Sequence, residues 1–223
     1  MVLLALTIAP ALAICIFIYW KDKFEKEPKK LLVLSFFLGI VSIIPVLIFE
    51  VYAIYLGLNA KGNIIQTAIY SFFGIGLVEE ACKYFFIRFV PYRSKAFNEP
   101  FDGITYSVMV AMGFATLENI IYVANGGYQV AIMRMLTAVP AHATFGIIIG
   151  YYLGLQKIKG IKSIGLKGLL MAATLHAAYD FFILVSYIPG MWFGALLSLY
   201  IGLRFSFRAI KIHQQASPFK IQS

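Results

Sequence analysis

The chain has 223 residues, of which 61% are hydrophobic and only 13% are charged, and its formal net charge is +9. Because water-soluble domains contain about 25% charged residues, this composition excludes an ordinary water-soluble globular protein. Apolar runs of about 18 residues or more, long enough to cross a bilayer as helices, recur along nearly the whole length. The sequence therefore predicts one integral membrane domain over residues 1–223, with an all-α fold.

Seven membrane-spanning helices account for the apolar runs and form the expected polytopic helix bundle. In chain order they are residues 2–20, 31–58, 64–89, 102–123, 128–155, 168–187 and 191–207. The first begins as MVLLALTIAPALA, which is like a signal peptide but lacks a basic region before the apolar run, so an uncleaved span is expected. Arg204 shortens the apolar run of the last span and is expected to extend its charged end to the interface.

Basic residues alternate between the connections that join these spans. Five lysines lie in the first connection, and three or four Lys and Arg lie around the third, around the fifth and in the C-terminal tail. The second connection has only Lys61, and the fourth and sixth have none. Since basic loops stay in the cytoplasm, the pattern predicts an N-terminus outside and a C-terminus inside the cell. The positive charge then serves topology and the lipid bilayer, and no nucleic-acid partner is expected.

Several ionisable residues lie within the predicted spans, where each charge near the bilayer centre costs about 2.5–3.5 kcal/mol. They are Glu79, Glu80 and Lys83 in the third span, Glu118 in the fourth, His142 in the fifth, and His176 and Asp180 in the sixth. Residues placed at such a cost mark a functional site by default. Carboxylates and imidazoles from four helices form a set suited to activating water, because one group takes a proton and another donates one or stabilises an oxyanion.

Helical spacing indicates which faces these residues occupy. Glu79 with Lys83, and His176 with Asp180, are four residues apart and can pair on one helix face. His142 begins a stripe of small residues at four-residue steps that allows a neighbouring helix to approach closely. The stripe continues through Gly146, Gly150 and Gly154. Pro140 is expected to kink the fifth helix near Leu136.

Structural interpretations remain open for each group taken alone. Glu79 and Lys83 can form a purely structural ion pair, His142 can join two helices, and His176 with Asp180 can orient the sixth helix. Their coincidence on four helices favours a functional site over packing. Two more charged residues lie near the outer interface and are expected to be anchors, Glu50 in the second span and Arg134 in the fifth.

Two functions from other classes compete with catalysis. Buried Glu, His and Asp also relay protons or bind coupling ions in membrane transporters. The sequence has no inverted repeat and no paired broken helices, which many transporters show. A helical scaffold is the third interpretation, in which a Glu80→Gln protein would keep full biological activity.

Four motifs in order, each within a predicted span, resemble those of the PrsW family of intramembrane proteases. They are EEACK (79–83), FATLEN (114–119), PAHATFG (140–146) and HAAYD (176–180), preceded by the charged loop KDKFEKEPKK (21–30). The resemblance covers essentially the whole chain. The family is distantly related to the CAAX prenyl proteases of the CPBP family, whose motifs run EExxxR, FxxxH and HxxxN. Here Lys83 replaces the arginine one position earlier, Glu118 replaces the histidine, and Asp180 replaces the asparagine.

The resemblance implies an intramembrane endopeptidase of the plasma membrane. Its expected substrate is a membrane protein, a single-pass anti-sigma factor cut at site 1 in regulated intramembrane proteolysis. It also implies catalytic roles for six residues, with Lys83 and Asn119 in support. The six are Glu79, Glu80, His176, Glu118, His142 and Asp180.

Two mechanisms stay open. In the glutamate mechanism, Glu79 or Glu80 deprotonates a water, and His176 held by Asp180 stabilises the oxyanion. His142 and Glu118 then place the water or protonate the leaving amine. In the metal mechanism, two histidines and a carboxylate hold Zn²⁺. One of the adjacent glutamates Glu79 and Glu80, called the EE pair below, is then the base. The expected ligands are His142 and His176 with Asp180 or Glu118. The chain lacks the HExxH zinc motif, and the metal-free mechanism is favoured.

Overall fold

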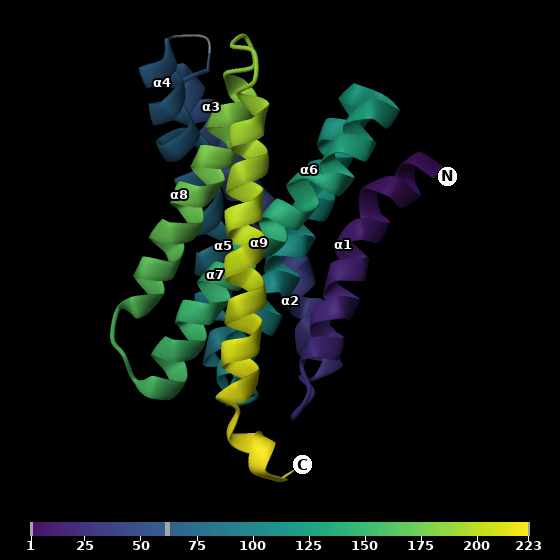
Figure 1. Ribbon diagram of the computed structural model, residues 1–223, viewed down its shortest axis with the longest axis vertical. Coiled ribbons are helices and arrows are strands. Elements are labelled where there is room, and N and C mark those ends of the chain that lie inside the picture. Colours follow the sequence, from purple (N-terminus) through teal and green to yellow (C-terminus); the bar gives the residue numbers. More distant parts are fainter. Residues whose placement is uncertain (1, 61–62, 223) are drawn as a thin grey trace.

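The computed structural model describes residues 2–60 and 63–222, and all regular structure within these ranges is helical (Figure 1). The α-helices are α1 (Val2–Lys21), α2 (Lys29–Val41), α3 (Ile43–Tyr55), α4 (Ile64–Ile69), α5 (Leu77–Phe89), α6 (Pro100–Leu136), α7 (Ala138–Lys159), α8 (Ile164–Leu184) and α9 (Trp192–Gln215). A π-helical segment, η1 (Tyr70–Gly76), joins α4 to α5. Short 3-10 turns follow at η2 (Pro91–Arg93) and η3 (Pro218–Gln222). The expected all-α fold is thus confirmed.

Four helical segments in the described part of the chain are long and apolar enough to cross a membrane. They are Val2–Lys21, Lys29–Tyr55, Pro100–Lys159 and Trp192–Gln215. The helices α5, which carries Glu79, Glu80 and Lys83, and α8, which carries His176 and Asp180, are not among them. An integral membrane protein is therefore supported, while the count of seven spans and the orientation stay predictions.

The predicted second and third spans are not single helices. Ser42 separates α2 from α3, and its side chain donates to the carbonyl oxygen of Gly39. The third span consists of α4, η1 and α5, and the π-helical segment ends at Gly76, one turn before Glu79 and Glu80. A π-helical turn changes the direction in which the following side chains point, and such turns are frequent at functional sites.

The junction between the fourth and fifth predicted spans is a reversal within α6. Gly127 has φ 64° and ψ −153°, a backbone conformation reserved for glycine, so the chain after it leaves the axis of the first part of α6. A second break follows at Thr137, three residues before Pro140. The predicted kink near Leu136 is thus confirmed as a helix boundary.

The centre of the molecule is the first half of α6, in which each residue from Pro100 to Thr116 is buried. It packs closely on α7, where a Cβ on Gly150 would overlap the backbone of Gly103. A Cβ on Gly113 would likewise overlap the carbonyl oxygen of Phe36 in α2. The small-residue stripe predicted from His142 onward therefore lies against α6, as expected.

Figure 1 shows the ends of the helices in two groups. The α1–α2 and α7–α8 connections lie at the same end of the bundle as the C-terminus. The α8–α9 connection and the tops of α3 and α4 lie at the opposite end. The lysine-rich connections are thus at one end.

Candidate active site

The EE pair and its lysine begin the site in the first turns of α5. Glu79, Glu80 and Lys83 expose 4%, 0% and 1% of their surface. Lys83 Nζ donates to Glu79 Oε2 at 3.1 Å and to Glu80 Oε1 at 2.8 Å. The Nζ atom also lies 3.9 Å from the centre of the Phe114 ring, a cation–π contact. The predicted Glu79–Lys83 pair is thus present, and the lysine serves both carboxylates.

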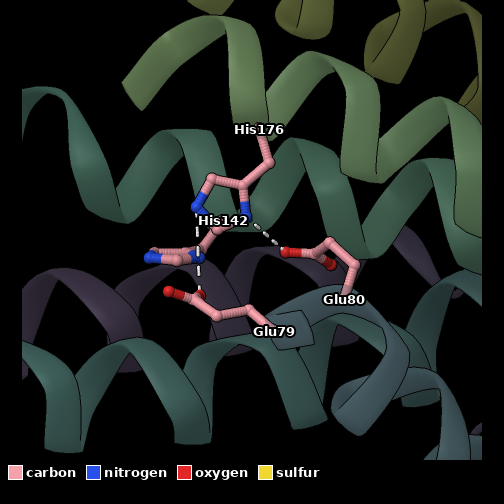
Figure 2. Close-up of side chains that lie close together, drawn as sticks. All are labelled: Glu79, Glu80, His142 and His176. Carbon is pink, nitrogen blue, oxygen red and sulfur yellow. Dashed lines mark hydrogen bonds and ion pairs between the residues drawn. The ribbon is translucent and has the colours of Figure 1, made fainter. Parts of the chain in front are cut away.

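His176 of α8 lies between two carboxylates, and Figure 2 shows its ring above the EE pair. Its Nδ1 is 2.9 Å from Glu80 Oε1, and its Nε2 is 3.2 Å from Asp180 Oδ2. Glu79 Oε2 is 3.9 Å from the same Nε2. When Glu80 and Asp180 are both ionised they only accept hydrogen bonds, so both ring nitrogens donate and His176 is an imidazolium.

His142 of α7 has one nitrogen toward Lys83 and the other toward α6. Lys83 Nζ is 3.2 Å from its Nδ1, and Glu118 Oε2 is 2.8 Å from its Nε2. An ammonium group only donates, so Nδ1 accepts and carries no proton. His142 is therefore the neutral tautomer with the proton on Nε2, which donates to Glu118. Its ring centre lies 5.2 Å from that of His176.

Arg134 binds the outer side of this network, which corrects the expectation that it is an interface anchor. Its Nη2 donates to Glu118 Oε2 at 2.5 Å and its Nε to Asn119 Oδ1 at 2.7 Å. The reversal at Gly127 explains why the expectation was wrong. It brings Arg134 back to Asn119 and Glu118, which are 15 and 16 positions earlier in the chain. The predicted supporting residue Asn119 thus helps to hold Arg134.

A cavity of about 760 Å³ reaches the site from the end of the bundle where α8 meets α9. Its wall includes Glu79, Glu118, Asp180 and Arg134, together with Ile188, Pro189, Gly190 and Trp192 at the α8–α9 connection. Glu50 of α3 also lines the cavity, and its role as an interface anchor stays a prediction. Glu79 is therefore the member of the EE pair that the cavity reaches.

The donor set resembles a metal centre in composition. Glu79, Glu80, His142 and His176 each offer one donor atom, and these atoms lie within 4.8 Å of one another (Figure 2). Histidine and carboxylate donors are typical of zinc. The sequence predicts Asp180 or Glu118 as the acidic ligand. In the structure Asp180 contacts the Nε2 atom of His176, and Glu118 contacts the Nε2 atom of His142.

Lys83 determines whether a metal ion fits this set. Its ammonium nitrogen lies 2.8–3.2 Å from Glu79, Glu80 and His142, so it already engages three of the four donor groups. Two cations cannot share that position, because their repulsion in a poorly solvated interior is strong. The residues as arranged therefore do not fit a metal ion while Lys83 keeps its place.

Comparison with known proteins agrees with the order of the motifs. Residues 27–207 match the model of the PrsW family intramembrane metalloprotease. Protease PrsW of Geobacillus kaustophilus (strain HTA426) is 34% identical over 197 residues, which are 87% of this chain and 85% of the relative. Protease PrsW of Bacillus subtilis (strain 168) is 36% identical over 78% of this chain and 79% of the relative. Protease PrsW of Oceanobacillus iheyensis is 39% identical over 80% and 81%. No solved structure matched. The chain belongs to the PrsW family and is an intramembrane protease.

Proposed function

We propose that this protein is an endopeptidase of the plasma membrane that cuts a membrane-embedded protein on its extracytoplasmic side, with a glutamate-activated water. The observation that carries the proposal is the contact of the cavity with Glu79, beside the His176–Asp180 pair. A cavity of about 760 Å³ is large enough for several residues of an unwound substrate segment and for water. A transporter is not favoured, because the chain belongs to a protease family.

The proposed topology has seven spans, with the N-terminus outside and the C-terminus in the cytoplasm. Basic residues gather in the α1–α2 and α7–α8 connections, at the end of the bundle where the C-terminus lies (Figure 1). The α8–α9 connection at the other end, residues 185–191, contains no basic residue. The positive-inside rule assigns the lysine-rich end to the cytoplasm. The cavity then opens toward the extracytoplasmic side, where a site-1 protease acts.

In the proposed mechanism Glu79 is the general base. It takes a proton from a water in the cavity while the water attacks the scissile carbonyl carbon. The oxyanion that forms is stabilised by His176, whose Nε2 proton lies on the side of Glu79 and Asp180. The proton held by Glu79 then passes to the leaving amine, so the carboxylate is regenerated.

The remaining residues hold these two groups in place. Glu80 Oε1 accepts from both Lys83 and His176, which joins α5 to α8. Glu118 accepts from His142 and Arg134, which joins the two halves of α6 to α7. Fixed dipoles and charges of this kind are effective because they need no reorganisation during the reaction.

The proposed substrate class is a single-pass membrane protein, and an anti-sigma factor is the member implied by the family resemblance. A cavity that opens to the extracytoplasmic side suits a single-pass substrate with a segment on that side of the membrane. Zn²⁺ chemistry is the alternative mechanism, and it requires that Lys83 leave the position it takes among the donors.

The test is cleavage of a tagged single-pass substrate in proteoliposomes, with and without a strong zinc chelator. Wild type is compared with Glu79→Gln, Glu80→Gln and His176→Ala, and with Glu25→Gln in the α1–α2 connection as the matched control. We expect cleavage by wild type and the control alone, unchanged by the chelator. Cleavage by Glu79→Gln at the wild-type rate would refute its role as base. Loss of activity on chelation, restored by zinc, would refute the metal-free mechanism.

A further inference from the structure

We propose that Glu50 binds a basic side chain of the substrate, so that this protease selects membrane proteins with Lys or Arg close to the scissile bond. The inference rests on the proposed function, because it names the substrate feature that the same cavity recognises. Glu50 lies on α3, separate from the helices that carry the EE pair and the histidines.

The position of Glu50 relates it directly to the reaction site. It lines the main cavity together with Glu79, Glu118 and Asp180. It also lines a smaller pocket of about 50 Å³ between α3 and α6, and Glu79 and Glu118 are in its wall too. Glu50 thus shares the walls of both the cavity and the smaller pocket with the proposed base Glu79.

The charges of the cavity wall are unbalanced, and Glu50 accounts for the imbalance. Each of the other three acids in the wall has a cationic or imidazole partner: Glu79 has Lys83, Glu118 has Arg134 and His142, and Asp180 has His176. Within residues 2–60 and 63–222, Glu50 makes no side-chain hydrogen bond and no ion pair. It is only half-buried, so its carboxylate remains accessible from the cavity.

An unpaired carboxylate within a membrane helix is costly unless it meets a cation or water. Water fills this role in the free enzyme, and a substrate ammonium or guanidinium group replaces that water on binding. Lys and Arg suit the position because their long aliphatic stems lie along apolar walls while the charged end reaches an acid. The wall beside Glu50 is aromatic and aliphatic, with Tyr70, Tyr122 and Ile75.

A requirement for a basic side chain would make the protease selective among membrane proteins. Short extracytoplasmic segments next to membrane spans are poor in Lys and Arg compared with cytoplasmic ones. A protease that requires a basic residue at an extracytoplasmic bond therefore leaves most membrane proteins intact. Purely apolar recognition would give no such discrimination, because the spans of most membrane proteins are similarly apolar.

The experiment uses a panel of single-pass substrates in proteoliposomes. One Lys is moved through the residues on either side of the scissile bond in an otherwise uncharged Ala and Leu segment, and a second series carries Glu instead. Full-length wild type, Glu50→Gln and Glu50→Lys are compared, with Glu25→Gln as the matched control. Mass spectrometry gives the cleavage site and the rate for each substrate.

We expect wild type and the control to cut the best Lys substrate at least tenfold faster than the uncharged one. Glu50→Gln should reduce this ratio to about one, and Glu50→Lys should favour the Glu substrate at the same position. An unchanged Lys preference in Glu50→Gln, or no preference in wild type, would overturn the inference.

Binding separates this inference from the proposed chemistry. Affinities of the same Lys, Glu and uncharged segments are measured for the Glu79→Gln protein and for Glu79→Gln/Glu50→Gln. A Lys preference that depends on Glu50 supports the inference even if wild type fails to cut, and that failure would count against the proposed function alone. Equal affinities for all three segments would refute the role of Glu50.

Discussion

Lys83 is the residue whose removal most directly tests the electrostatics of the site. Its ammonium group is 1% exposed and contacts Glu79, Glu80 and His142 at 2.8–3.2 Å. Lys83→Met keeps most of the side-chain length but leaves two neighbouring buried carboxylates without their common cation. Breaking a buried ion pair by removing one partner costs about 3–5 kcal/mol, so we expect a loss of stability in this range.

A double variant identifies the cause of that loss. Lys83→Met/Glu79→Gln removes the cation and one of the two negative charges, so it should be more stable than Lys83→Met alone. Lys30→Met, which removes an exposed lysine at the start of α2, is the control and should differ little from wild type.

The assay is unfolding of the purified proteins in mixed micelles, followed by circular dichroism as the denaturing detergent is increased. Metal content is measured on the same samples. A loss below about 1 kcal/mol for Lys83→Met would refute the reasoning, because a buried pair broken on one side costs several times more. Stoichiometric zinc in wild type would refute it independently, since the ion would then hold the carboxylates in place of Lys83.

Three further predictions concern the supports of the site and the α1–α2 connection. Arg134→Gln and Arg134→Lys should both lower kcat/KM at least tenfold in the proteoliposome assay. A single ammonium group cannot reproduce the two guanidinium contacts to Glu118 and to the side-chain amide of Asn119. Wild-type activity of the Lys variant would contradict this. Gly150→Ala should destabilise the protein by about 1–3 kcal/mol, because the added Cβ meets the backbone of Gly103, and an unchanged melting temperature would show that the helices separate freely. Burial, and then the charges of neighbouring carboxylates, raise the pKa of Asp22 to about 7 from 3.8. The folded protein therefore holds a proton that the unfolded chain loses between about pH 4 and 7, so stability should fall as pH rises through this window. Asp22→Asn should raise the melting temperature at pH 8 and remove part of the pH dependence.

The grouping of the site residues could be predicted because a membrane penalises each buried charge. Helical spacing alone predicts the pairs Glu79–Lys83 and His176–Asp180, and both pairs are in contact. Local spacing is a reliable guide there, because residues four apart on a helix lie on one face whatever the tertiary fold. The glycine stripe after His142 was predictable for the same reason.

The roles of Glu50 and Arg134 could not be predicted, because they depend on where helices meet. Their positions near the ends of predicted spans indicate only that both residues lie near the outer interface. Arg134 reaches Glu118 only because Gly127 reverses the chain, and no local pattern gives the direction of that reversal. Glu50 lines the cavity because α3 packs against α5 and α6, and no local pattern gives that packing. Hydropathy gives the depth of a residue along one helix but not the neighbour it faces.

The arrangement of the EE pair explains why two adjacent glutamates serve better than one. Glu80 is fully enclosed, and its Oε1 atom is committed to Lys83 and His176, so this residue holds α5 against α8. Glu79 uses its Oε2 atom for Lys83 and lines the cavity, so it can exchange a proton with water there. A single glutamate in both roles would have to give up its contacts to the histidine and the lysine in each cycle. Adjacent residues on a helix point about 100° apart, so Glu80 can serve as the fixed support while Glu79 serves as the proposed base.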